Sequence, residues 1–369
     1  MTDTAAPADS TTQQAQTGDN HLSLSGGLLL VGDTTMAAGH LYGAHQYSKI
    51  GDIKQRNGKY ASAVTAMGWG LGGIAAFLFG NPPDAMRARI EARNLDRFLK
   101  AHDIDIPQSV RDTHPLMKPL GGIERIKEFC YTYPSEILNG VFAVFSLGLI
   151  QGGLRAFASK DANAKANRNS LWIGLAVITG ALGGLFIKED ADAGKKAENA
   201  GPVSKAIAWF KEKPLRFSSG MYLVNNLFLA RVAWDEYQIF KKDPARKNFM
   251  FSGATLASYV TANIMLSMSS RDAAKHANIN GEQLQQIKNL AAEIVAAQPK
   301  HKRQRVFSEV MQYLETERGL NVSGSELHEQ LANDVEQAGQ RRIEQVAERG
   351  WRARQEQQRE QQPEAEHGV

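Results

Sequence analysis

A long uncharged run at 61–80 constrains the fold of this chain more than any other feature of its sequence. The run reads ASAVTAMGWGLGGIAAFLFG, and a helix of roughly 20 residues crosses a bilayer core about 30 Å thick. Similar apolar runs occupy 137–154, 171–187 and 249–268. Neither one membrane anchor nor one signal sequence accounts for four such runs, so we expect an integral membrane protein that crosses the bilayer several times.

A fifth stretch, at 22–44, is long enough to span but contains Asp33 and His40, so its hydropathy alone is a weak indication. An internal repeat strengthens the prediction that this stretch spans the membrane. Similar segments that contain serine and end in glycine stand at 23–27, 134–140 and 214–220. An apolar helix follows each segment, then a basic turn, at 49–57, 160–169 and 241–248, and then one of the apolar runs. This order predicts three helical hairpins and six spans.

The predicted fold is therefore all-α, a polytopic bundle of about six membrane helices with a helical C-terminal extension. We expect transmembrane hairpins at 22–80, 135–187 and 216–270, joined by amphipathic connections at 81–134 and 188–215. The remaining parts are a disordered N-terminal tail at 1–21, a soluble helical extension at 271–350 and a disordered tail at 351–369, for which a frayed helix is the alternative.

Two segments of the connections, 84–101 and 202–214, place apolar residues at helical spacing among basic ones. Such helices are typical of the layer of lipid headgroups, and we interpret both segments in that way. The alternative for these segments is a small soluble helical insertion.

Small residues inside the apolar runs predict close packing between helices. Four glycine pairs have members four residues apart, on one helical face: Gly39 and Gly43, Gly68 and Gly72, Gly148 and Gly152, Gly180 and Gly184. We expect these faces to pack within one bundle. The alternative is that they join copies of the chain into a homo-oligomer.

Polar groups within the predicted spans are the candidates for function, because burying them in a membrane is costly. Asp33 and His40 are seven residues apart and share one face of the first span. The repeat places Asp33 opposite Asn226 of the fifth span, which also contains Asn225 and Arg231. These residues predict a polar path for an ion or small solute. Alternatively they only join helices, with Arg231 paired to Asp33 or to Asp235.

The sequence contains no Walker, His-Glu-x-x-His or Gly-x-Ser-x-Gly motif, so nothing in it favours an enzyme. Its single cysteine, Cys130, has no partner for a disulfide or a thiolate metal site, and we expect neither a metal nor a cofactor. The net charge of +4 is too small and too dispersed for a nucleic-acid binder.

Two functions remain open. The first is movement of a small solute or ion through the bundle, and the second is a membrane anchor or scaffold that recruits a protein partner through helices in 271–350. The basic turns and the absence of a signal peptide suit a bacterial inner membrane. Six spans place both termini on one side, and the cytoplasmic side is favoured by the long charged tail, although the basic turns indicate the opposite orientation.

Overall fold

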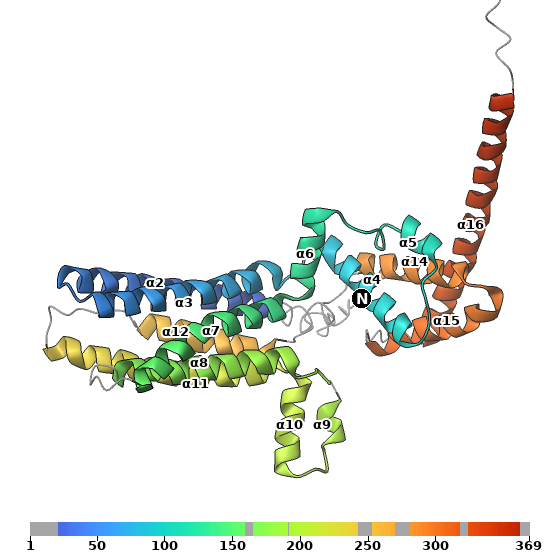
Figure 1. Cartoon of the computed structure of the whole chain (residues 1–369). Helices are drawn as coiled ribbons and strands as arrows, with labels where there is room; N and C mark the ends of the chain where they lie inside the picture. The colour runs from blue at the N-terminus through green and yellow to red at the C-terminus, as the bar shows by residue number, and fades with distance from the viewer. Residues whose placement is uncertain are drawn as a thin grey trace, which may run out of the picture. The chain divides into compact units, whose positions relative to one another are not determined.

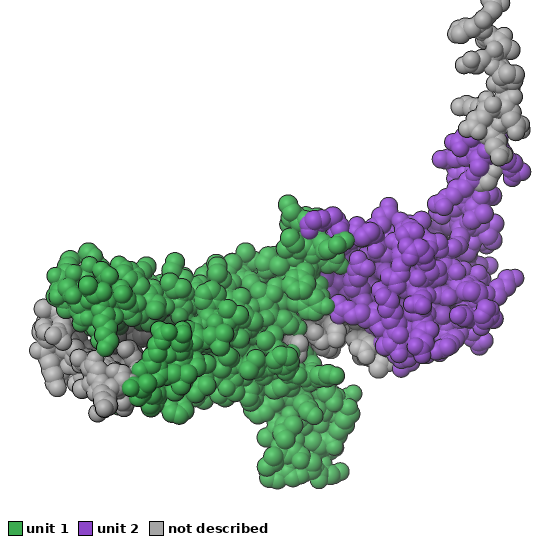
Figure 2. All heavy atoms as spheres, viewed as in Figure 1, with its two compact units in different colours: residues 1–82, 123–278 green, residues 83–122, 279–369 purple. Residues whose placement is uncertain are grey.

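The computed structural model describes residues 21–158, 165–190, 192–242, 253–269, 281–317 and 324–361. Within these ranges the protein is all-α, with 14 α-helices, one short π-helix and no strand. The chain divides into two compact units (Figure 2). Unit 1 comprises 1–82 and 123–278, and unit 2 comprises 83–122 and 279–369. The expected tail at 1–20 and the turn residues 159–164 and 243–252 lie outside the described residues.

Unit 1 contains six long helices arranged as three hairpins (Figure 1). The pairs are α2 (His21–Lys49) with α3 (Ile53–Phe79), α7 (Pro134–Ala158) with α8 (Lys165–Phe186), and α11 (Leu215–Lys242) with α12 (Gly253–Met268). In the first turn, Gly51 adopts a φ of 73°, a conformation that favours glycine. Asp52 then caps α3 by accepting a hydrogen bond from the Gln55 N–H.

The six long helices form a closed ring. Each helix packs against the next one in the chain, and α12 packs against α2. The three hairpins bury equivalent positions, at a constant spacing, in their first helices. These positions are Ser25, Gly26, Leu29 and Asp33 in α2; Leu138, Asn139, Phe142 and Ser146 in α7; and Ser218, Ser219, Tyr222 and Asn226 in α11. The repeat found in the sequence therefore has a counterpart in the packing of the ring.

Three of the described helices contain a segment long and apolar enough to cross a membrane: Ile53–Phe79, Pro134–Arg155 and Asn169–Phe186. The expectation of six such helices is thus met only in part. The apolar run at 249–268 corresponds to α12, whose described length is 16 residues. Helices α2 and α11 are longer, but polar residues interrupt their apolar sequences.

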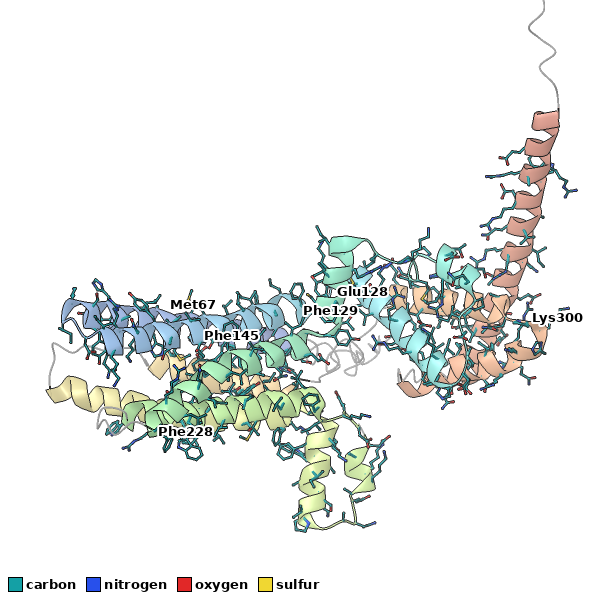
Figure 3. The ribbon with its side chains drawn as sticks, in the orientation of Figure 1. Met67, Glu128, Phe129, Phe145, Phe228 and Lys300 are labelled. Carbon is teal, nitrogen blue, oxygen red and sulfur yellow. The ribbon has the colours of Figure 1, made fainter. Side chains whose placement is uncertain are left out.

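All six helices nevertheless expose large apolar side chains on the outside of the ring. Met67 of α3 is one of them (Figure 3). The others include Leu24 and Val31 of α2, Val144 and Leu147 of α7, Leu175 and Leu182 of α8, Val224 and Leu227 of α11, and Ile264 of α12. Between the helices, an apolar cluster that includes Leu29, Trp69 and Phe142 is buried together with several serine, threonine and asparagine side chains and the Asp33 carboxylate. An apolar outer surface of this extent is not typical of a water-soluble bundle.

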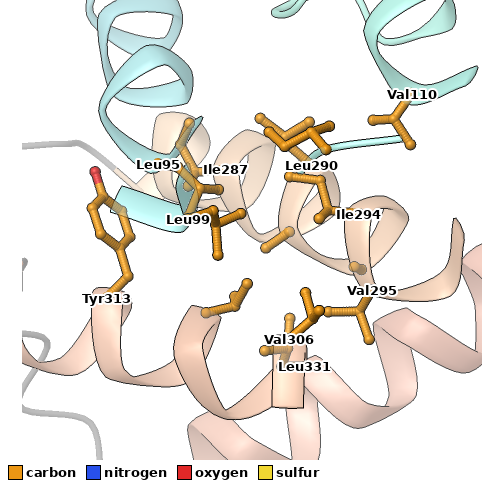
Figure 4. Packing of buried hydrophobic residues seen from close by; sticks show 14 of the residues in the cluster. Leu95, Leu99, Val110, Ile287, Leu290, Ile294, Val295, Val306, Tyr313 and Leu331 are labelled. Atoms are coloured by element: carbon orange, nitrogen blue, oxygen red, sulfur yellow. The ribbon is translucent and has the colours of Figure 1, made fainter. Parts of the chain in front are cut away.

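Unit 2 has an apolar core of its own (Figure 4). It is built from α4 (Asp84–Ala101), α5 (Gln108–Thr113), α14 (Gly281–Ala297), α15 (Lys300–Gln312), a π-helix (Tyr313–Glu317) and α16 (Gly324–Gln361). Leu95 and Leu99 of α4 are fully buried beside Ile287, Leu290 and Ile294 of α14. The apolar face of 84–101, expected to contact lipid headgroups, is therefore covered by protein, as in the alternative of a soluble insertion.

The extension after residue 270 also differs from the expected arrangement in two respects. Its core is not formed by the helices after residue 270 alone. Helices α4 and α5, from the first long connection, also contribute to it. In addition, α16 continues to Gln361, so the tail expected to be disordered from 351 begins as a helix, in agreement with the alternative of a frayed helix. Its later part exposes Ile343, Val346 and Trp351.

Candidate functional site

Asp33 is the most completely buried acidic residue of the described ring, with a side chain 0% exposed. Its Oδ1 accepts a hydrogen bond of 2.6 Å from the Tyr259 hydroxyl of α12. Its Oδ2 has no hydrogen-bond partner among the described residues. The Tyr259 ring reaches this position because residue 32 is glycine, and a Cβ there would lie 2.9 Å from the ring.

Besides His21 Nδ1 at the start of α2, four further buried polar atoms of the ring lack a hydrogen-bond partner among the described residues. They are Trp69 Nε1 of α3, Asn225 Oδ1 and Asn226 Nδ2 of α11, and Asn263 Oδ1 of α12. All four side chains are less than a tenth exposed. Each unsatisfied buried group costs about 1 to 3 kcal/mol, and most native structures contain few of them. Together with Asp33, these atoms give the ring both donors and acceptors that no group in the described part of the chain satisfies.

Other polar and aromatic side chains in the ring are paired, and they connect different hairpins. The Tyr222 hydroxyl of α11 donates a 2.7 Å hydrogen bond to Asn139 Oδ1 of α7. The Phe142 ring lies between those of Trp69 and Tyr222, with centroid distances of 5.9 Å and 5.3 Å. One continuous set of contacts therefore links α3, α7 and α11, which belong to three different hairpins.

Two of the three interfaces between hairpins have an equivalent hydrogen bond. Ser218 Oγ of α11 donates to the Gly180 carbonyl of α8 at 2.9 Å, and Ser25 Oγ of α2 donates to the Ala262 carbonyl of α12 at 2.8 Å. At the third interface, the position of the serine is occupied by Leu138, which packs against Gly72 of α3. The ring is thus closed between its ends by the same hydrogen bond that joins its second and third hairpins.

The glycine pairs differ in their surroundings. A Cβ at Gly68 or Gly72 would meet Phe145 or Phe142 of α7, and one at Gly184 would lie 2.4 Å from Ser218 Oγ. Gly180 is similarly close to α11. Gly39 and Gly43 are buried in α2.

The pair Gly148 and Gly152 does not make the expected close contact within the bundle. Both residues are exposed, and a Cβ at Gly152 would meet nothing within 4 Å. The close approach of α7 to α8 occurs at Gly153 instead, where a Cβ would lie 2.5 Å from Leu171. Self-association through glycine faces stays a prediction.

The remaining candidate residues are not gathered around Asp33. Arg231 is exposed on α11, while His40 is half-buried on α2. The ion pair between Arg231 and Asp33, which was one alternative to a polar path, is not formed, because Tyr259 donates to Oδ1 and Oδ2 has no hydrogen-bond partner among the described residues. The side chain of Asp235 lies outside the described residues. Sequence reasoning missed Tyr259, whose hydroxyl within an apolar run was the available signal.

Among the described residues, no group of three or more His, Cys, Asp or Glu side chains is arranged to hold a metal ion. Comparison of the chain with protein-family models, curated proteins and solved structures finds no match. The case for a function therefore depends on the geometry of the ring.

Proposed function

We propose that unit 1 is a six-span membrane bundle that moves a small cation, the proton included, through the polar interior of its ring. The six spans are supported by the apolar side chains that all six helices expose, including α2, α11 and α12. Lipid tails solvate such surfaces, whereas water does not. Buried polar groups inside a bundle with an apolar outer surface are what a membrane path requires.

The observation that carries this proposal is the buried Asp33 carboxylate. Its only hydrogen bond among the described residues comes from the neutral Tyr259 hydroxyl, and Oδ2 has no partner. A carboxylate removed from water is stabilised by a proton or by a bound cation. Asp33 is therefore the residue that would bind the transported cation, with Oδ2 as the available ligand.

The asparagines supply further ligands for a partly dehydrated cation. Asn225 and Asn263 each have a buried amide oxygen without a partner. Amide oxygens replace water around small cations in many binding sites. Asn226 stands at the position of α11 equivalent to that of Asp33 in α2, and His40 lies two turns from Asp33 along the same helix. Arg231, exposed on α11, is not part of the proposed path.

The experiment is a flux measurement on the purified full-length protein in liposomes that contain a trapped pH-sensitive dye. A potassium diffusion potential drives proton entry, and parallel assays follow sodium and rubidium uptake. The test variant is Asp33→Asn. Asparagine retains an oxygen that accepts the Tyr259 hydrogen bond, so the substitution removes the charge while preserving the contact between α2 and α12.

The matched control is Asp52→Asn, which removes a carboxylate from the turn between α2 and α3 but can still cap α3. We expect flux of at least one cation through the unaltered protein and the control, and its loss in Asp33→Asn at equal insertion. Undiminished flux in Asp33→Asn contradicts the assignment of Asp33, and no flux of any of the three cations contradicts the proposed function.

A second candidate function, a membrane-anchored scaffold, is favoured by α16. Its later part exposes Ile343, Val346 and Trp351, with side chains 71%, 66% and 59% exposed. Leu331 and Ala338, near its beginning, are buried in the core of unit 2. Truncation after Arg342 therefore removes the exposed apolar residues and leaves the core. A scaffold would lose its protein partner on this truncation, whereas a cation path in unit 1 would keep its flux.

A further inference from the structure

Two short helices of unit 1 occupy equivalent places in the repeat. Helix α6 (Gly122–Thr132) precedes Pro134 at the start of α7, and α10 (Pro202–Glu212) precedes Pro214 at the start of α11. Both lie at the same end of the ring and run across the direction of the long helices (Figure 1). Contacts hold them there, because Tyr131 packs edge-on against Phe79 of α3 and Phe210 packs edge-on against Phe217 of α11.

The two helices expose apolar side chains at matching positions. Ile123 of α6 and Val203 of α10, each just after the helix start, are 73% and 72% exposed. Phe129 and Trp209, six residues further along, are 56% and 50% exposed. Phe129 is drawn in Figure 3, beside the charged Glu128. No residue of α6 is buried, and Ala208 is the buried residue of α10, so the fold of unit 1 does not explain these apolar faces.

The charges of α10 indicate what covers its apolar face. Lys205 and Lys211 lie on the same helix as Trp209, and Lys213 follows directly. The Arg216 guanidinium lies 4.7 Å from the centre of the Trp209 ring and donates a 2.9 Å hydrogen bond to the Trp209 carbonyl. A tryptophan among basic residues at the end of a transmembrane helix is typical of the headgroup layer. In α6 the charges balance, with Glu124 and Lys127 forming an ion pair.

We propose that α6 and α10 lie in the headgroup layer on one side of the bilayer, with their apolar faces toward the acyl chains, and that α10 binds anionic phospholipid through its lysines. This inference depends on the proposed membrane arrangement of the ring. It assigns to α6 the place that the sequence had suggested for α4, whose apolar face is buried in unit 2. Each short helix leads directly into a ring helix, α7 or α11, that itself exposes large apolar side chains.

The test measures the depth of fluorescent labels in lipid vesicles. Full-length variants Ile123→Cys and Val203→Cys, each with Cys130→Ser, are labelled with a polarity-sensitive fluorophore and reconstituted in phosphatidylcholine with or without phosphatidylglycerol. Quenching by a lipid with a nitroxide on its headgroup is compared with quenching by a lipid with the nitroxide deep in the acyl chain. Leu71→Cys, on the exposed face of α3, serves as the control for the bilayer interior.

We expect both short-helix labels to be quenched more strongly by the headgroup nitroxide, and the Leu71 label more strongly by the deep nitroxide. Phosphatidylglycerol should increase quenching of the Val203 label, and the double variant Lys205→Gln with Lys211→Gln should abolish that increase.

Water-like emission without quenching at positions 123 and 203, with the Leu71 label still quenched, overturns this inference and leaves the membrane arrangement intact. An unquenched Leu71 label contradicts the membrane arrangement itself. Equal quenching of the Val203 label with and without phosphatidylglycerol overturns the assignment of anionic lipid to α10.

Discussion

Tyr259 of α12 donates a 2.6 Å hydrogen bond to Asp33 of α2, so the last helix of the ring is tied to the first through a buried carboxylate. Two hydrogen bonds from side-chain hydroxyls reinforce the same interface, because Ser25 donates to the Ala262 carbonyl and Ser258 donates to the Leu28 carbonyl. The first and third hairpins are therefore joined by several polar contacts. A ring closed in this way holds Asp33 at a fixed position between α2 and α12.

The substitution Tyr259→Phe should destabilise the six-helix ring, because it removes the hydrogen bond to Asp33 while preserving the shape of the aromatic side chain. The expected loss is about 1 to 3 kcal/mol, the cost of leaving one more buried acceptor without a partner. The measurement is the midpoint of thermal unfolding in detergent micelles. Tyr42→Phe provides the control, since Tyr42 is 43% exposed on α2. Equal midpoints for the two variants would show that the bond to Asp33 contributes little.

Alanine substitutions should affect two glycines in opposite directions. In Gly184→Ala the new methyl group would be too close to Ser218 Oγ and would lie 2.7 Å from Asn139 Nδ2. Either Ser218 gives up its hydrogen bond to the Gly180 carbonyl or α8 moves away from α11. A loss of about 1 to 3 kcal/mol is expected from such overpacking. In Gly152→Ala the methyl group meets nothing within 4 Å, and a helical alanine gains about 0.5 to 1 kcal/mol over glycine.

Thermal unfolding of the two glycine variants in the same detergent compares these effects directly. The account predicts a lower midpoint for Gly184→Ala and an unchanged or higher midpoint for Gly152→Ala. The opposite order would mean that the α8–α11 interface is looser than the structure indicates. A lower midpoint for Gly152→Ala, together with a smaller oligomer, would instead indicate that the exposed glycine face joins copies of the chain.

Unit 2 should lose stability as the pH falls below about 6.5. Burial lowers the pKa of His114 from its usual value of 6.5, and the charge of Glu293 offsets part of this effect. A hydrogen bond also favours the neutral His114 imidazole, because its Nδ1 accepts from the Leu116 N–H at 3.3 Å and cannot do so when protonated. Between pH 6.5 and the lower pKa of the folded state, the unfolded chain therefore binds more protons than the folded one.

The contribution of His114 is thus fully present above pH 6.5 and is lost as the pH falls toward the folded-state pKa, by about 1.4 kcal/mol per unit of pKa difference. Hydrogen exchange of the α14 amides, corrected for the intrinsic effect of pH, measures it. His114→Gln should reduce the pH dependence, whereas His301→Gln, at an exposed position, should leave it unchanged. If both variants retain the pH dependence of stability of the unaltered chain, a group other than His114 is responsible.

The hairpins of the ring could be predicted from the sequence because each contains local signals, such as an apolar run and a repeated spacing. Unit 2 could not be predicted, because its core joins segments that are far apart in the chain. The face of α4 that carries Leu95 and Leu99 is equally suited to lipid headgroups and to a protein core, and nothing local distinguishes the two. Leu290 of α14, which belongs to the same core, comes after all six ring helices in the sequence.

The surroundings of Asp33 were predicted incompletely for a related reason. A charged residue in an apolar run suggests a charged partner, and Arg231 was the nearest candidate in an equivalent hairpin. The structure provides a neutral hydroxyl instead, from Tyr259. Such a partner has no charge pattern by which a sequence reveals it. The burial of Asp33 and Asn226 at equivalent positions, by contrast, follows from the constant spacing of the repeat.

The central claim, that all six ring helices cross the membrane, is tested most directly by thiol labelling from one side of the membrane. Single cysteines at Ser10, Ser48, Gly201 and Ala245, with Cys130→Ser, are exposed to an impermeant reagent in intact cells and in inverted vesicles. Six spans predict that Ser10 labels from the same side as Gly201, and Ala245 from the same side as Ser48. If only α3, α7 and α8 cross, Ser10 labels with Ser48 and Ala245 labels with Gly201, and that result would contradict the account.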